Sequence, residues 1–170
     1  RFNIPELCVS ILSLSPDYDL LVIDDNSNDG TKEILEIIES DYSRLTVIHR
    51  PRKMGVGSAH KAAMIYALKN RYEYLVTMDA DFSHNPKDIP RLLDEAKEHD
   101  LVIGSRRVAG GKIVGGNIIR HLTSYGATVF ARAFLGLRAK DVTAGFRCIK
   151  REVLENISLD TIASSGYAFQ

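Results

Sequence analysis

Two pairs of aspartates stand directly after apolar segments of the sequence, where they could bind a cation. Asp24 and Asp25 follow one apolar run, and Asp79 and Asp81 follow another, with Ala80 between them. Mg²⁺ and Mn²⁺ prefer oxygen ligands and are typically held by one or two carboxylates together with phosphate oxygens of a substrate. The Asp-x-Asp pair is therefore a candidate metal site, although this spacing by itself also arises by chance.

An acidic residue at the end of a strand can instead cap the helix that follows, by accepting a hydrogen bond from a backbone amide of its first turn. We favour this structural role for Asp29 and Asp88, each of which stands close to the start of an expected helix. For Asp79 and Asp81, the sequence supports the metal site and the structural role about equally.

The charge of the chain is balanced overall but unevenly distributed. Its 22 Lys and Arg residues equal its 22 Asp and Glu residues, which argues against a nucleic-acid-binding protein. Residues 101–140 nevertheless contain seven basic residues and no Asp or Glu. An acidic region beside a basic one favours a metal bound next to an anion. The structural alternative is a solvated basic helix with its flanking loops.

Apolar runs and amphipathic segments alternate along the chain, which is the pattern of βα units. We expect strands at residues 19–24, 45–48, 74–78, 101–103 and 145–149, and helices at 3–14, from 29–31 onward, and at 58–71, 86–99 and 117–135. This alternation predicts an α/β fold with a mostly parallel sheet and helices on both faces. Ligands of open parallel sheets bind beyond the carboxyl ends of the strands, where both aspartate pairs fall.

Composition excludes several classes of protein. The 170 residues are 45% hydrophobic and 26% charged, which fits one globular domain and not a disordered or fibrous chain. No apolar stretch approaches the roughly 20 residues of a membrane span, and no secretory signal is apparent, so we expect a cytoplasmic location. Cys8 and Cys148 are too far apart for a disulfide framework, and the five histidines lack zinc-site spacing.

Five segments, taken in order, resemble one known family. They are VIDDNSNDGT at 22–31, the loop at 50–57, DADFSHNP at 79–86, GSR at 104–106 and DVTAGFR at 141–147. Together they resemble the GT-A fold, family 2 glycosyltransferases, and among them the dolichyl-phosphate (polyprenol-phosphate) mannosyltransferases. The resemblance implies a Rossmann-like GT-A domain that transfers mannose, with inversion, from GDP-mannose to dolichyl or polyprenyl phosphate.

The resemblance also implies where a cation is held. In that family the Asp-x-Asp motif binds the divalent ion that carries the nucleotide diphosphate, which implies Mg²⁺ or Mn²⁺ at Asp79 and Asp81. Ala80, between them, belongs to the same cofactor site, and Asp81 counts among the catalytic groups. Ser83, two residues further on, is a candidate ligand directly or through water.

Other site residues follow from the same resemblance. The end of the first strand contacts the base and ribose in that family, which implies donor binding by Asp24 and Asp25. Arginines of the glycine-rich loop and the next helix hold the acceptor phosphate and the leaving diphosphate, which implies Arg106 and Arg120, with Ser124 one turn after Arg120. These last three residues lie in the region without carboxylates.

A lipid acceptor implies peripheral membrane contact, at the cytosolic face, through this basic region. Family members usually begin with a further strand and a turn, and they continue with another helix and sometimes a membrane anchor. We therefore expect residues 1–170 to be one catalytic domain that lacks its first strand and its C-terminal end. The membrane contact of such a domain would be supplied by a separate membrane subunit or by a C-terminal anchor that is missing here.

Three other functions remain open at this point. One is a different family 2 transfer, for example of glucose, to polyprenyl phosphate. A haloacid-dehalogenase-type phosphatase also uses Asp-x-Asp at a strand end, with the first Asp as nucleophile, but on its first strand. A non-catalytic module that binds nucleotide sugars is the third.

Overall fold

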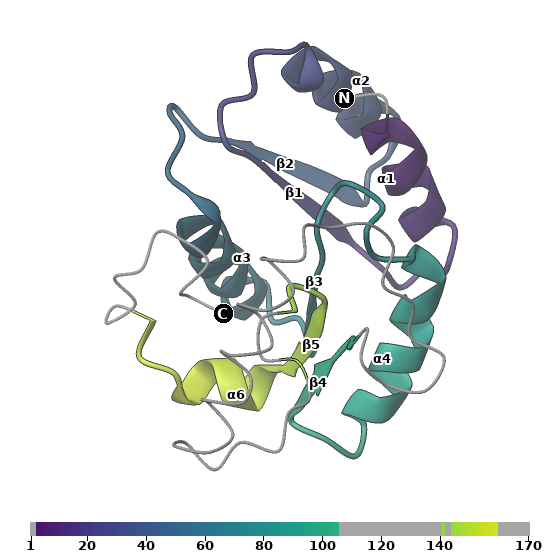
Figure 1. Ribbon diagram of the computed structural model, residues 1–170, viewed down its shortest axis with the longest axis vertical. Helices are drawn as coiled ribbons and strands as arrows, with labels where there is room; N and C mark the ends of the chain where they lie inside the picture. The colour runs from purple at the N-terminus through teal and green to yellow at the C-terminus, as the bar shows by residue number, and fades with distance from the viewer. Residues whose placement is uncertain (1–2, 106–140, 142–143, 160–170) are drawn as a thin grey trace, which may run out of the picture.

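The computed structural model of the 170-residue chain describes residues 3–105, 141 and 144–159. The strands are β1 (Leu20–Asp24), β2 (Leu45–His49), β3 (Tyr74–Thr77), β4 (Leu101–Ile103) and β5 (Arg147–Lys150). The helices are α1 (Ile4–Leu12), α2 (Thr31–Asp41), α3 (Val56–Lys69), the 3-10 helix η1 (Pro86–Asp88), α4 (Ile89–Ala96) and α6 (Arg151–Asn156), as labelled in Figure 1.

The described strands form two sheets. β1 and β2 are parallel, with a register that runs from Leu20 opposite Leu45 to Asp24 opposite His49. The second sheet has the order β3-β5-β4, and β5 is antiparallel to both of its neighbours. The expected strand at 145–149 is thus present as β5, but it runs opposite to the other strands.

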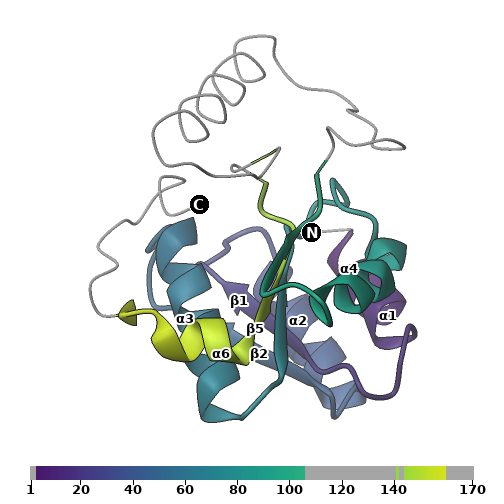
Figure 2. The ribbon, with the colours of Figure 1, turned by 90° about the horizontal axis from the view of Figure 1, so that it is seen from below.

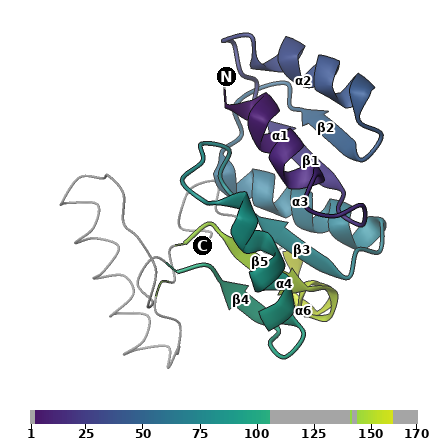
Figure 3. The ribbon, with the colours of Figure 1, turned by 90° about the vertical axis from the view of Figure 1, so that its right-hand side faces the viewer.

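Helices cover both faces of the sheets, which confirms the α/β class (Figure 2). On one face, α1 packs against α2 and shares a buried cluster with α4, and the three helices follow one another across that face (Figure 3). On the other face, Met64 and Ala67 of α3 and Leu154 of α6 pack on Leu75 and Ile149. The apolar faces of the amphipathic helices therefore supply the core on both sides of the strands.

The helix and strand boundaries of the described residues agree with the sequence-based expectation within a few residues, with two exceptions. The short helix α6 was not expected, and the expected helix at 117–135 lies outside the described residues. The expected capping role is confirmed for Asp29, which accepts a hydrogen bond from the amide of Thr31 at 3.2 Å. It is wrong for Asp88, which precedes α4 but makes no side-chain capping hydrogen bond. The cap of this helical segment is instead Asn85, which precedes η1 and accepts a hydrogen bond from Lys87 N at 3.1 Å.

β1 and β3 start at the same end of the molecule. The Tyr72 hydroxyl, just before β3, donates to Asp19 Oδ2, just before β1, at 2.7 Å. The carboxyl ends of these strands therefore lie together at the opposite end, toward the start of α3. Within the described residues, no helix is both long enough and apolar enough to cross a membrane.

Candidate active site

Asp24 closes β1 with a carboxylate that is almost entirely buried, at 4% exposure. Its Oδ1 accepts the backbone N–H of Ser27 at 3.2 Å, and its Oδ2 lies 3.2 Å from His49 Nδ1 at the end of β2. Burial alone would raise the pKa of Asp24, but the hydrogen bonds from Ser27 and His49 outweigh it and lower that pKa. Asp24 is therefore ionised at neutral pH and ties the ends of β1 and β2 together.

Asp25 holds the loop that leads from β2 to α3. Its two carboxylate oxygens accept the backbone N–H groups of Met54 at 2.7 Å and Gly55 at 2.9 Å, and Arg50 Nη2 lies 2.8 Å from Oδ1. Burial raises the pKa of Asp25, but these hydrogen bonds and the Arg50 charge together lower it. The ionised carboxylate thus fixes the backbone of the loop beside the end of β1.

Arg50 is the buried counterpart of Asp25. Its side chain donates to the Ser58 hydroxyl and, through Nη2, to the Gly55 carbonyl at 3.2 Å. A guanidinium that serves a carboxylate, a carbonyl and a hydroxyl at once holds the loop and the first turn of α3 rigidly. This role could not be predicted from the sequence, because a basic residue after a strand is the only local feature at the position.

Asp79 and Asp81 present exposed carboxylates just beyond the end of β3. Asp81 Oδ1 accepts the Ser83 backbone N–H at 2.9 Å. Hydrogen bonding from Ser83 lowers the pKa of Asp81 against a smaller opposing effect of burial, so the group is ionised at neutral pH. Ala80, between the two aspartates, is exposed as well.

These residues fit a hexacoordinate Mg²⁺ or Mn²⁺ ion. Two oxygen-donor side chains, Asp79 and Asp81, lie two residues apart and are open to solvent. Among the described residues, no group of three or more His, Cys, Asp or Glu side chains could hold a metal ion. A cation at Asp79 and Asp81 would therefore take its remaining ligands from water and phosphate, which is the usual Mg²⁺ arrangement.

His84 holds the backbone of the Asp-x-Asp turn through a hydrogen bond and a ring contact. Its buried imidazole accepts the Asp79 backbone N–H at Nδ1, at 3.2 Å, and its ring stacks on Phe146 with centroids 5.1 Å apart. Phe146 in turn packs so closely on Gly104 that a Cβ there would lie 2.5 Å from Phe146 Cδ1. The segments that follow β3 and β4 and the segment that precedes β5 thus pack on one another and together position the Asp-x-Asp turn.

A second group of buried charges lies beside this support. Burial lowers the pKa of the Arg147 guanidinium, and the fully buried Asp141 carboxylate opposes that shift. On α3, burial and the charge of Arg147 lower the pKa of His60, while the Asp79 charge raises it. His60 is therefore neutral at pH 7 and lies close enough to feel both Asp79 and Arg147.

The start of α3 connects the two aspartate pairs. Gly55, which precedes α3, donates its backbone N–H to Asp25. His60 lies in the first turns of α3, where the charge of Asp79 raises its pKa. The structure thus gathers six predicted site residues at the carboxyl ends of β1 and β3, namely Asp24, Asp25, Asp79, Ala80, Asp81 and Ser83. The other three predicted residues, Arg106, Arg120 and Ser124, lie outside the described residues.

Comparisons with known proteins agree on one family. The sequence profile of the family described as "Glycosyl transferase family 2" matches residues 3–158. An "Undecaprenyl-phosphate mannosyltransferase" of Micrococcus luteus is 43% identical over 155 residues, which cover 91% of this chain and 64% of that protein. A "Polyprenol monophosphomannose synthase" of Mycolicibacterium smegmatis is 41% identical over 172 residues, which cover 100% of this chain and 65% of that protein. The chain thus spans just under two thirds of the length of these relatives.

Proposed function

Because the chain belongs to glycosyl transferase family 2, we propose that it transfers mannose, with inversion, from GDP-mannose to dolichyl or polyprenyl phosphate. The observation that carries the proposal is the pair of exposed carboxylates, Asp79 and Asp81, beside the loop that Asp25 and Arg50 hold. The two relatives at 43% and 41% identity, both named as mannose-transferring enzymes of polyprenyl lipids, support the choice of sugar and acceptor.

Asp79 and Asp81 would hold Mg²⁺ or Mn²⁺ together with the diphosphate of the donor, and Ser83 would contribute directly or through water. An ion held there would neutralise charge on the departing diphosphate. Asp24 and Asp25 have their carboxylate oxygens engaged within the protein. We propose that they serve the base and ribose of the donor chiefly by positioning the loop after β2.

In the reaction, an oxygen of the acceptor phosphate forms a bond to C1 of mannose while the bond from C1 to the diphosphate oxygen breaks. The bonding electrons leave with GDP, and the acceptor, already an anion, needs no strong general base. Arg106, Arg120 and Ser124 would orient the acceptor phosphate and balance the charge of the leaving group. A guanidinium fork matches the geometry of a phosphate.

A lipid acceptor requires contact with a membrane surface, which we propose occurs through the basic region 101–140. We expect the protein to bind vesicles that contain anionic lipid, and added salt to weaken this binding because it screens the charges. Sedimentation with neutral and anionic vesicles at low and high ionic strength measures both effects. Binding that ignores lipid charge and salt alike would contradict the proposed contact.

His84 should act as a positioning residue for the cation site. His84→Ala removes the acceptor of the Asp79 N–H, so we expect roughly 10-fold weaker Mn²⁺ affinity in the presence of GDP, the usual effect of losing an outer-shell partner. His84→Asn, whose side-chain oxygen can replace Nδ1, should recover part of the loss. Mn²⁺ titration calorimetry measures the affinity. A purely structural role would lower the melting temperature of both variants without this difference between them.

A panel of nucleotide sugars tests the proposed donor. We expect GDP-mannose with Mn²⁺ to raise the melting temperature more than UDP-glucose, UDP-galactose or any donor without the cation, because only a ligand of the native state stabilises it. A larger shift with a uridine nucleotide would favour a different family 2 transfer. No shift with any nucleotide sugar would contradict donor binding altogether.

A further inference from the structure

Phe82, between Asp81 and Ser83, departs from two ordinary preferences of a phenylalanine. Its backbone φ angle is 57°, in the left-handed region, which bulky residues rarely adopt because their Cβ crowds the following carbonyl. The residue is also 37% exposed. Among the described residues, none of the buried apolar clusters includes Phe82. Neither the backbone nor the packing of these residues therefore calls for a phenylalanine here.

The left-handed backbone at this position has a role of its own. Phe82 forms the middle of a tight turn, in which Ser83 donates its backbone N–H to Asp81 Oδ1 at 2.9 Å. The turn thus fixes one of the two carboxylates that we assign to the cation. Glycine or asparagine would form it at lower cost, because both adopt a positive φ more readily. The turn explains the conformation at position 82 but not the aromatic side chain.

The neighbouring loops show the usual choice of residue. At this end of the strands, Asn26 and Gly30 follow β1 and Gly55 follows β2, with φ angles of 60°, 86° and 88°. Phe82 is the exception in the loop that follows β3. An exposed apolar side chain alone is common on protein surfaces. Combined with a strained backbone beside the proposed cation site, it indicates a functional position.

On the basis of the proposed transfer reaction, we infer that the ring of Phe82 binds the isoprenoid chain of the acceptor lipid, next to its phosphate. This chain is the one part of either substrate that has no hydrogen-bonding groups. It therefore matches an exposed aromatic ring better than the sugar or the diphosphate does, because apolar surfaces associate to leave water. The contact offsets the cost of holding a phenylalanine in this turn.

The reaction itself brings the chain to this position. The attacking oxygen of the acceptor phosphate must come within about 3–3.5 Å of C1 of the sugar. C1 is bonded to the diphosphate that we place at Asp79 and Asp81. The first isoprenoid carbon lies only three bonds beyond the attacking oxygen, and the Cα of Phe82 lies about 3.8 Å from that of Asp81. The start of the isoprenoid chain therefore passes close to the ring.

Binding of farnesyl phosphate, below its micelle concentration, tests the contact without any transfer. Phe82→Gly keeps a residue that adopts the turn and removes the ring. We expect it to bind farnesyl phosphate about tenfold more weakly, as the loss of roughly 55 Å² of apolar contact predicts. Its affinity for inorganic phosphate, and for GDP with Mn²⁺, should not change. Titration calorimetry measures all three affinities.

Phe82→Leu and Phe82→Asn separate the side chain from the backbone. Leucine keeps an apolar side chain, so we expect its affinity for farnesyl phosphate to stay within about threefold of the unaltered protein. Asparagine accepts the positive φ but is polar, so this variant should bind as weakly as Phe82→Gly. A role of the turn alone predicts the opposite order, with leucine the more disruptive replacement.

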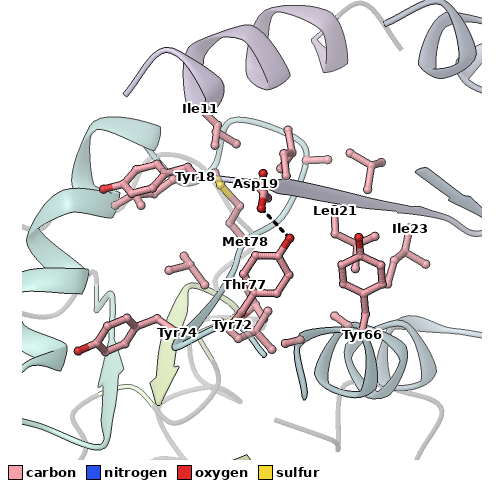
Figure 4. Close-up of a pocket in the computed structure, with 18 of the residues that line it drawn as sticks. Ile11, Tyr18, Asp19, Leu21, Ile23, Tyr66, Tyr72, Tyr74, Thr77 and Met78 are labelled. Carbon is pink, nitrogen blue, oxygen red and sulfur yellow. Dashed lines mark hydrogen bonds between the residues drawn. The ribbon is translucent and has the colours of Figure 1, made fainter. Parts of the chain in front are cut away.

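Arg71→Gly is the matched control for a strained backbone. Arg71 is exposed and has a φ angle of 60°. It directly precedes Tyr72, whose hydroxyl donates to Asp19 at 2.7 Å where β1 and β3 begin, at the opposite end of the strands (Figure 4). We expect its melting temperature to rise by about 2–4 °C and its affinity for farnesyl phosphate to remain that of the unaltered protein. Phe82→Gly should also melt no lower than the unaltered protein.

Three results would overturn the role of Phe82. The first is equal affinity for farnesyl phosphate in Phe82→Gly and the unaltered protein, or no binding by either. The second is weaker binding of GDP-mannose with unchanged binding of farnesyl phosphate, which would assign the ring to the sugar. The third is a lower melting temperature with all ligands weakened alike, which would show that the ring packs within the protein.

The proposed function can fail separately from this inference. Absence of mannose transfer by the unaltered protein would refute the proposed function. The difference in farnesyl phosphate affinity between Phe82→Gly and Phe82→Leu would still decide whether Phe82 binds an isoprenoid chain. Conversely, normal transfer with equal affinities in these variants would refute the contact and leave the proposed function standing.

Discussion

Asp79→Asn and Asp81→Asn should each weaken Mn²⁺-dependent binding of GDP by about two orders of magnitude, because the affinity of such sites is tuned over several decades by the number of charged ligands. Both carboxylates are exposed beyond the end of β3, so their replacement should leave packing and melting temperature nearly unchanged. Titration calorimetry of GDP with and without Mn²⁺ measures the loss.

Asp94→Asn is the matched control, because Asp94 is an exposed carboxylate on α4 that forms a surface contact of 2.6 Å with the neighbouring Lys97. It should bind GDP with Mn²⁺ as the unaltered protein does. Affinity that is the same in Asp79→Asn, Asp81→Asn and Asp94→Asn would remove the cation from this position.

Arg120→Ala should leave the affinity for GDP-mannose nearly intact while transfer to the lipid phosphate falls by about 100-fold or more. A hydrogen bond to a charged group contributes roughly 1.5–3 kcal/mol, and an interaction with the acceptor in the transition state affects turnover in full. Arg120→Lys should recover only part of the rate, because an ammonium keeps the charge but not the bidentate fork. Donor affinity and transfer rate must therefore be measured for both variants.

Arg91→Ala is the control for a lost surface arginine, since Arg91 lies on α4 with its side chain 74% exposed. We expect neither its donor affinity nor its transfer rate to change. Equal transfer rates for the unaltered protein and Arg120→Ala would refute the acceptor role of Arg120.

The positions of the strands followed from the sequence because their physical cause is local. β1 and β3 are short apolar runs that end in Asp-rich turns, and this pattern can be recognised in the sequence without knowledge of the fold. The direction of β5 did not follow, because an apolar run carries no information on whether it pairs parallel or antiparallel. The direction appears only in the pairing with the neighbouring strands, which runs from Tyr74 opposite Lys150 to Thr77 opposite Arg147 on the β3 side and is antiparallel on the β4 side as well.

The residues that support the site could not be predicted, because their roles depend on contacts with residues that are distant in the sequence. Arg50 and His84 act through partners that the fold brings to them, such as Asp25, which is 25 positions away from Arg50, and Phe146, which is 62 positions away from His84. The choice between Asp88 and Asn85 as a cap likewise depends on local backbone angles that side-chain types do not specify. The exposed aspartates could therefore be predicted from the sequence, whereas the buried groups that position their loops could not.

The most direct test of the proposed function is the product formed from radiolabelled nucleotide sugars and a short-chain polyprenyl phosphate with Mn²⁺. We predict a lipid-linked mannose from GDP-mannose, no lipid-linked glucose from UDP-glucose, and loss of product in Asp79→Asn. Transfer of glucose in preference to mannose, or release of free mannose with no lipid-linked product, would contradict the assignment of this chain as a polyprenyl-phosphate mannosyltransferase.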